Sequence, residues 1–274
     1  MDVIRQRLEQ YTPDLGACWL LVILMFAGSL SAGLVLKDST PQSLAYFLSM
    51  AVPFLFIILF GKSSTGPVPL NKPDFGRLGG GTAFCTCALA MICLIVIMDP
   101  STSFIPMPDR IKAVFEETFI NLPLWDSILS TCILAPIMEE TLCRGVMMRG
   151  MLQHGSARRA IFWSAFIFAI MHANPWQSIP AFVIGIFFGW LYWRTGCLWL
   201  TIFLHCLNNS ISTAMTSIMP EVEIDQCLLD VMGPSFWIFF AAALIIFAAL
   251  TYIVYEKTIP AQIHSDSQQE SLGE

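Results

Sequence analysis

Hydrophobic residues fill long stretches of this chain, and short polar breaks separate one stretch from the next. Eight stretches of roughly 17–25 residues approach the length that an α-helix needs to cross the hydrocarbon core of a bilayer. They cover residues 15–36, 43–61, 78–98, 124–150, 157–173, 178–194, 197–217 and 234–255. The breaks are rich in turn-forming residues such as Gly, Pro, Ser and Asp. The pattern therefore predicts an all-α, polytopic membrane protein with about eight transmembrane helices.

Two segments depart from this pattern. Residues 109–122 place apolar side chains at helical spacing, with two glutamates on the other side; the apolar positions are Ile111, Val114, Phe115, Phe119 and Leu122. This arrangement is typical of a helix that lies in the membrane interface. The tail from Pro260 onwards is rich in Ser, Gln, Asp and Glu, and its composition predicts disorder.

The composition supports a membrane environment. Of the 274 residues, 56% are hydrophobic and only 12% are charged, whereas a soluble domain carries about a quarter charged residues. A soluble fold of this size would lack the polar residues to cover its surface, so the lipid bilayer is the expected partner. The sequence contains no basic patch of the kind that binds nucleic acid, so we expect no nucleic-acid partner.

Basic residues are distributed unevenly between the two sets of loops, and cytoplasmic loops carry the excess of Lys and Arg. With the N-terminus in the cytoplasm, three cations lie outside: Lys37, Arg110 and Lys112. Ten lie inside: Arg5, Arg7, Lys62, Lys72, Arg77, Arg149, Arg158, Arg159, Arg194 and Lys257. The asymmetry predicts a cell-membrane protein with both termini in the cytoplasm and with the acidic loop 221–225 outside.

The fourth stretch contains three charged residues that fit neither set of loops: Glu139, Glu140 and Arg144. A charge near the bilayer centre costs about 2.5–3.5 kcal/mol on insertion scales, so three together indicate a function. Glu140 precedes Arg144 by one helical turn, an order that favours an ion pair. Glu139 points about 100° away around the helix, so we expect it to remain free for chemistry. Pro136 removes a backbone donor and is expected to kink the helix nearby.

Two later stretches carry further polar residues at helical spacing. Phe168 and His172 share one face of the fifth stretch, and His205 and Asn209 share one face of the seventh. Counted at about 1.5 Å per residue, Glu139, His172 and His205 lie about 12–21 Å from the cytoplasmic ends of their helices. Three helices thus deliver polar groups to a similar depth, and we expect them to form one site.

These motifs, in this order, resemble those of the glutamate-dependent intramembrane proteases of the CAAX-protease and bacteriocin-processing family. They read EExxxR from Glu139, FxxxH from Phe168 and HxxxN from His205. The resemblance covers roughly residues 124–217, so we expect a catalytic core there. It would follow N-terminal helices and the interfacial segment (1–123), and precede a last helix and the disordered tail (218–274).

The resemblance implies an eight-helix membrane endopeptidase that needs no metal or other cofactor. By motif position, Glu139 would be the general base that activates water, assisted by His172, while His205 and Asn209 would form the oxyanion site. The supporting residues of the cavity would be Glu140, Arg144 and Phe168. The substrate would be a protein or peptide, with CAAX-type C-terminal tails among the candidates. We expect it to arrive through a funnel that faces the cytoplasm.

Alternatives remain open at this point. Glu139, His172 and His205 could supply a Glu/His/His zinc site with an open position, although the sequence lacks the helical zinc-protease signature HExxH. A proton-coupled transporter can also carry buried Glu and His, but it predicts paired broken helices in two related halves. A non-catalytic membrane binding or immunity protein of the same fold would keep these residues without the reaction. The cluster could also be purely structural.

Overall fold

A long central helix organises the molecule. The computed structural model describes residues 2–37, 39–62, 67–219 and 225–261, so the predicted disorder beyond residue 261 and most of the acidic loop 221–225 lie outside the described residues. The central helix runs without a break through α6 (Leu124–Ser127), η4 (Ile128–Leu134), α7 (Ala135–Glu140), η5 (Thr141–Met148) and α8 (Arg149–His154). Its η4 and η5 segments are π-helical, a local widening of the helix that is frequent at functional sites. Pro136, which has no backbone N–H to donate, is the second residue after the end of η4.

The remaining elements are also helical. Before the central helix come α1 (Asp2–Gln10), α2 (Leu15–Val35), α3 (Gln42–Phe60), η1 (Gly76–Leu78), α4 (Gly80–Met98), η2 (Asp99–Thr102), α5 (Asp109–Phe115) and η3 (Glu116–Ile120). After it come α9 (Ala157–Met171), α10 (Pro175–Thr195), α11 (Leu198–Ile218), α12 (Leu228–Met232), η6 (Gly233–Ser235) and α13 (Phe236–Lys257). The described residues contain no strand, and the helix predicted within 109–122 is present as α5 and η3.

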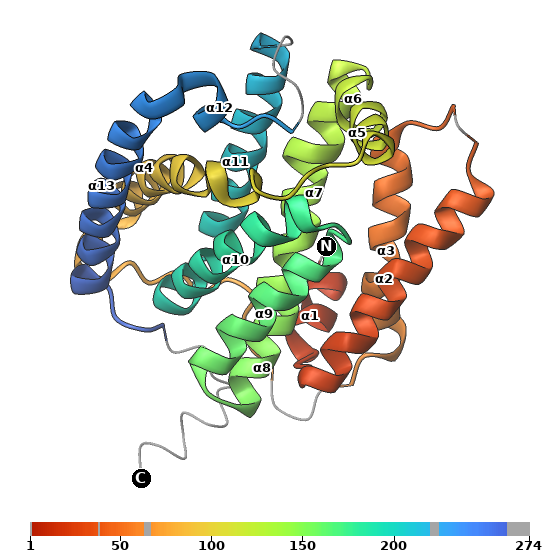
Figure 1. The fold of residues 1–274 in the computed structure, drawn as a ribbon. Coiled ribbons are helices and arrows are strands. Elements are labelled where there is room, and N and C mark those ends of the chain that lie inside the picture. Colours follow the sequence, from red (N-terminus) through yellow and green to blue (C-terminus); the bar gives the residue numbers. More distant parts are fainter. Residues whose placement is uncertain (1, 38, 63–66, 220–224, 262–274) are drawn as a thin grey trace.

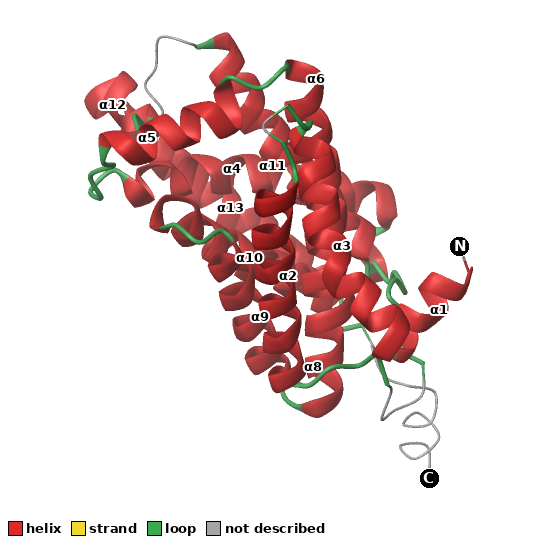
Figure 2. Ribbon diagram, turned by 90° about the vertical axis from the view of Figure 1, so that its right-hand side faces the viewer, coloured by secondary structure: helices red, strands yellow, loops and turns green. Residues whose placement is uncertain are grey.

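Three helix pairs surround the central helix and α11 (Figures 1 and 2). The helices α2 and α3 pack as an antiparallel hairpin, as do α9 and α10, whereas α4 and α13 pack side by side although they are distant in the sequence. One hydrophobic core lies between α2, α3, the central helix and α9. A second core lies between α4, α10, α11 and α13. Helix α11 contacts both η4 and α7 and so lies along the middle of the central helix.

All eight predicted stretches are helical, and the all-α membrane class is confirmed. Within the described part of the chain, four helices are long and apolar enough to cross a membrane: Leu15–Val35, Gln42–Phe60, Gly80–Thr102 and Leu228–Lys257. The central helix, α9, α10 and α11 each contain buried polar side chains, and α9 has only 15 residues. The number of eight membrane crossings therefore stays a prediction.

Arg149 joins the N-terminal segment to the central helix. Its side chain is fully buried, and its guanidinium donates to five backbone carbonyl groups, those of Leu8, Glu9, Tyr11, Val68 and Gly145. Arg194, also buried, donates to the Thr258 hydroxyl and the Tyr255 carbonyl. The prediction that placed both arginines among the loop cations was wrong about their surroundings. We call the first arrangement the Arg149 clasp.

Asp126 fixes the start of α3. The residue before this helix is Pro41, whose side chain has no capping oxygen. Instead, the Asp126 carboxylate accepts hydrogen bonds from the backbone N–H groups of Gln42 (2.7 Å) and Ser43 (2.9 Å), which supplies an N-cap from another helix. This contact holds α3 against the central helix and sets the position of Tyr46, one turn further on.

Candidate active site

The two adjacent glutamates of α7 face different surroundings, as their helical angles predict. Glu140 is fully buried, and its Oε1 lies 2.7 Å from Nη1 of Arg144, one turn along the same helix. The predicted ion pair is therefore present, and neither side chain is exposed. Glu139 lines a cavity instead. The central helix thus directs the carboxylate of Glu140, paired with Arg144, into the protein interior and the carboxylate of Glu139 toward the cavity.

Arg144 is held on three further sides. Its Nη2 donates to the Gly185 carbonyl of α10 at 3.0 Å, and its guanidinium carbon lies 4.6 Å from the ring centre of Phe168 and 5.6 Å from that of Phe188. Gly185 allows this approach because a Cβ there would come within 3.0 Å of Ala165 and 3.3 Å of Arg144. The absence of a side chain at this position brings α10 close enough for its backbone to contact the arginine.

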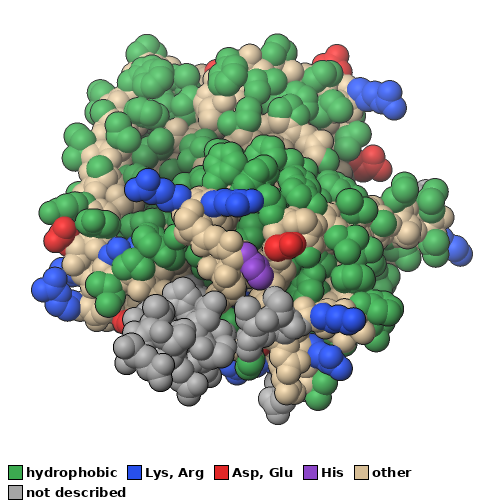
Figure 3. Space-filling view, turned by 90° about the horizontal axis from the view of Figure 1, so that it is seen from below, with side chains coloured by type: hydrophobic (Ala, Val, Ile, Leu, Met, Phe, Trp, Pro, Cys, Tyr) green, Lys and Arg blue, Asp and Glu red, His purple; other side chains and the backbone are tan. Residues whose placement is uncertain are grey.

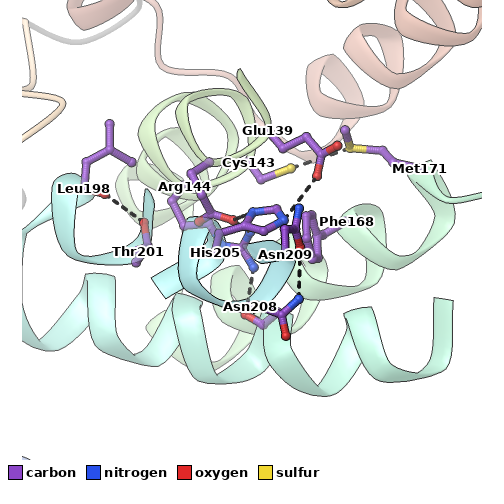
Figure 4. A network of polar contacts seen from close by, with 12 residues as sticks. Glu139, Cys143, Arg144, Phe168, Met171, Leu198, Thr201, His205, Asn208 and Asn209 are labelled. Atoms are coloured by element: carbon purple, nitrogen blue, oxygen red, sulfur yellow. Dashed lines mark hydrogen bonds and ion pairs between the residues drawn. The ribbon is translucent and has the colours of Figure 1, made fainter. Parts of the chain in front are cut away.

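His205 connects the two glutamates. Its Nδ1 lies 3.2 Å from Oε1 of Glu140, and its Nε2 lies 3.9 Å from Oε2 of Glu139 (Figure 4). An ionised carboxylate only accepts hydrogen bonds, so the proton on Nδ1 is donated to Glu140. The edges and faces of Phe168 and Phe188 flank the imidazole at 5.5 and 5.9 Å between ring centres. The ring of His205 is therefore fixed, with its second nitrogen directed toward Glu139.

His172 ends α9 beside the same cavity. Its Nδ1 lies 2.9 Å from the Phe168 carbonyl oxygen. Because a carbonyl can only accept, Nδ1 carries the hydrogen, and neutral His172 keeps Nε2 as a proton acceptor. The next residue, Ala173, has a φ of 56°, and Asn174 then caps α10 through its side chain. This tight connection places His172 at the boundary between the helix pair and the cavity.

The cavity has a volume of about 370 Å³ and lies between α2, α3, α7 and the end of α9. Its walls are mostly small or apolar, and its polar side includes Glu139, His172 and Tyr46. The Tyr46 hydroxyl donates to Oε1 of Glu139 at 2.7 Å. Glu139 thus has one oxygen held by Tyr46 and the other facing His205, at the edge of a space large enough for part of a substrate.

Comparison with known proteins shows what this core is similar to. Residues 121–211 match the family model described as type II CAAX prenyl endopeptidase Rce1-like. For this similarity we call residues 121–211 the Rce1-like domain. The chain is also 30% identical over 88 residues to a Bacillus subtilis (strain 168) protein named "Putative membrane peptidase YdiL". That match covers 32% of this chain and 36% of the relative. No solved structure matches the chain significantly.

The structure brings most of the predicted residues of the Rce1-like domain into one place. His205 lies next to Glu139, Glu140 and Phe168. Arg144 in turn contacts Glu140 and Phe168. Phe168 packs between the two histidines, since its ring centre is also 5.1 Å from that of His172, and its supporting role in the cavity stays a prediction.

Asn209 belongs to the same cluster but is already engaged. Its Nδ2 donates to the Thr131 carbonyl at 2.8 Å, and its Oδ1 accepts from Asn208 at 3.0 Å. An amide nitrogen carries two hydrogens, so one remains for a further acceptor. The Rce1-like domain therefore holds Asn209 in a fixed orientation, and its predicted oxyanion role stays a prediction.

Tyr46 and the cavity wall of α2 and α3 were missed in the sequence. Both lie outside the matched residues 121–211 of the Rce1-like domain. The one available signal was a hydroxyl-bearing ring within an apolar helix, since a buried Tyr hydroxyl usually finds a partner. That signal does not say which partner, and 93 residues separate Tyr46 from Glu139.

A metal site was the main chemical alternative. Across the part of the chain that the structure describes, no group of three or more His, Cys, Asp or Glu side chains is arranged to hold a metal ion. The donors that the zinc alternative requires, Glu139, His172 and His205, are therefore not gathered into a set of ligands around one point.

Proposed function

We propose that this chain is an intramembrane endopeptidase in which Glu139 activates a water molecule for attack on a peptide bond near the membrane. One observation carries the proposal: Glu139 lines a cavity beside His172, while its neighbour Glu140 is neutralised by Arg144 in the protein interior. The Rce1-like match and the peptidase name of the B. subtilis relative support the same class of reaction.

The two carboxylates have separate tasks in this proposal. Glu139 takes a proton from water, whose oxygen then bonds to the carbonyl carbon of the substrate. When the carbon–nitrogen bond breaks, the proton passes to the leaving amine. General bases of this kind contribute about 10²–10⁴-fold to the rate. Glu140 holds Arg144 and orients His205 through Nδ1, so it acts as a positioning residue.

The histidines complete the site. His172 offers an unprotonated Nε2 beside the cavity and assists Glu139 in accepting or passing on the proton. Asn209 contributes its free N–H to the oxyanion that forms on the substrate carbonyl, and His205 contributes Nε2–H when both of its ring nitrogens are protonated. Fixed donors of this kind are worth about 10²–10³-fold each in a water-poor site. Phe168 keeps the two imidazole rings apart and in place.

The substrate is a protein or peptide, and the family description makes CAAX-type C-terminal tails one class to test. The test is peptide cleavage by the purified full chain in detergent, where both faces of the protein are accessible. Glu139→Gln should lower cleavage by at least about 10²-fold, whereas Glu256→Gln, at an exposed glutamate of α13, should match the wild type.

Each arm should be run with and without a chelator. Cleavage that persists with chelator and is lost in Glu139→Gln supports the glutamate mechanism. Loss on chelation with recovery on adding zinc overturns it in favour of the metal alternative. If no peptide in a broad panel, CAAX-type tails included, is cleaved by the folded wild type, the peptidase proposal is wrong and a binding or immunity role gains weight.

A further inference from the structure

The cavity lies in the half of the molecule that is farthest from Asp2 and Ala261, the two ends of the described chain, which we call the termini. Its α2 residues run from Met25 to Gly33 in the second half of that helix, and its α3 residues run from Gln42 to Met50 in the first half of the next. Because α2 and α3 form an antiparallel hairpin, these halves lie at the same end, beside the connection 36–41. His172 is at the matching end of α9.

The opposite half of the same helices is closed. Between the cavity and the terminal face, Cys18 and Leu21 of α2 and Met147 and Met148 of the central helix have no exposed surface. Trp19 packs edge-on against Trp163 and Phe166, which joins α2 to α9 at that level. The Arg149 clasp then holds residues 8–11 beneath this layer. A peptide therefore has no open path between α2 and α9 from the face that carries the termini.

Helix α11 shows the same asymmetry on the other side of the site. Its first half is apolar except for the buried Thr201 and His205. Its second half, which begins at the site and ends at the face opposite the termini, is polar: Asn208, Asn209, Ser210, Ser212, Thr213, Thr216 and Ser217. Several of these residues are exposed. Polar side chains in a membrane protein pair within the protein or face water, so the second half of α11 is the more polar side of the site.

Charge distinguishes the two faces. The face with the termini carries eight exposed cations, Arg5, Arg7, Lys62, Lys72, Arg77, Arg158, Arg159 and Lys257, and Figure 3 shows Lys and Arg side chains on it. The opposite face has Lys37, Arg110 and Lys112, the last paired with Asp225 at 2.7 Å. The asymmetry persists although the buried Arg149 and Arg194 are left out of this count. Because cytoplasmic surfaces carry the excess of Lys and Arg, the asymmetry assigns the face with the termini to the cytoplasm.

We infer that the site opens to the non-cytoplasmic side of the membrane and that its substrates are peptide segments presented there. This inference rests on the proposed function, and it names the class of peptide that function acts on. It replaces the expected cytoplasm-facing funnel, which does not fit a cavity at the end opposite cytoplasmic termini. C-terminal tails of cytoplasmic proteins would then be out of reach in the cell, even where the purified protein cleaves such sequences.

The test is labelling of two engineered cysteines with a membrane-impermeant thiol reagent, in intact cells that express the full chain. Gly33 lines the cavity, and Gly81 lies at the cytoplasmic start of α4; a Cβ at either position meets no atom within 4 Å. Gly33→Cys and Gly81→Cys form a matched pair. The wild type measures the background of the nine native cysteines, of which Cys85 is exposed.

We expect Gly33→Cys to be labelled in intact cells and Gly81→Cys only after permeabilisation. The reverse pattern, or labelling of Gly33→Cys only after permeabilisation, would overturn the inference and place the site on the cytoplasmic side. Ser29→Cys, at an exposed cavity position, serves if Gly33→Cys does not fold. Because labelling does not depend on catalysis, this result stands even if the proposed peptidase activity fails.

A second readout links the opening to the reaction. In detergent, a bulky label on Gly33→Cys should block peptide cleavage, since it fills the cavity beside Glu139, and the same label on Gly81→Cys should leave cleavage unchanged. Full activity of labelled Gly33→Cys would show that substrates reach Glu139 by another route. If both unlabelled variants are already inactive, the substitutions have impaired folding, and an unfolding curve of each variant identifies this case.

Discussion

The buried pair between Glu140 and Arg144 makes a sharp prediction about stability. Both side chains have no exposed surface, and their charged atoms are 2.7 Å apart. Removing one partner of such a pair leaves an uncompensated charge in a low-dielectric interior, which costs about 3–5 kcal/mol. Arg144→Met should fall in the upper part of this range, because it also removes the contact with the Phe168 ring, a type worth about 2 kcal/mol when desolvated.

The decisive comparison is a double-mutant cycle. Glu140→Gln alone leaves Arg144 charged and buried, and Arg144→Met alone leaves Glu140 in the same state. The double variant removes both charges, so its loss of unfolding free energy should be smaller than the sum of the single losses by about 1–3 kcal/mol. Arg159→Met, at an exposed arginine near the start of α9, should change stability by less than about 0.5 kcal/mol.

The assay is equilibrium unfolding in mixed micelles of a mild detergent and sodium dodecyl sulfate. Fluorescence of the 8 tryptophans follows the transition, and the two singles, the double, the control and the wild type are measured together. Strictly additive losses would show that the two charges do not interact in the folded protein. A wild-type transition for Arg144→Met would refute the premise that the arginine is buried.

Three further predictions concern contacts outside the ion pair. Tyr46→Phe should fold normally but lower kcat with little change in KM, because the hydroxyl holds Oε1 of Glu139 in place; an unchanged kcat would contradict this role. Arg149→Met should lower the unfolding free energy by more than about 3 kcal/mol, because the variant loses the hydrogen bonds to backbone carbonyl groups. Limited proteolysis should then cut the N-terminal segment of this variant, whereas the same segment of Arg159→Met should stay intact. Asp126→Asn should cost about 1 kcal/mol in the same unfolding assay because it weakens the cap of α3, and a larger loss would point to a further role.

The helices and the ion pair could be predicted because their signals are local. A hydrophobic stretch of suitable length predicts a helix wherever it packs, and the spacing of Glu140 and Arg144 places them on one face of the same helix. The gathering of His172 and His205 near Glu139 followed from depth along three helices together with motif order. These residues all lie within the family match, 121–211.

Contacts between distant helices could not be predicted in the same way. Tyr46 reaches Glu139 only because the Asp126 cap fixes where α3 begins, and no pattern in either segment records that register. Arg149 was counted with the cytoplasmic loop cations because it lies at the end of the stretch 124–150. Its partners are backbone carbonyl groups, which every residue possesses, so they leave no mark on the sequence. Which half of α2 and α9 is packed and which half borders the cavity depends on contacts between helices, and hydropathy along the chain does not record those contacts.

The Arg149 clasp also sets an order for biogenesis. The carbonyl groups of Leu8 and Tyr11 emerge from the ribosome long before Arg149 is made, with 141 and 138 residues between the partners. The clasp can close only after the central helix has been synthesised. The N-terminal segment therefore stays undocked while the first helices insert, and it docks late in assembly. A co-translational crosslinking experiment can measure when this docking occurs.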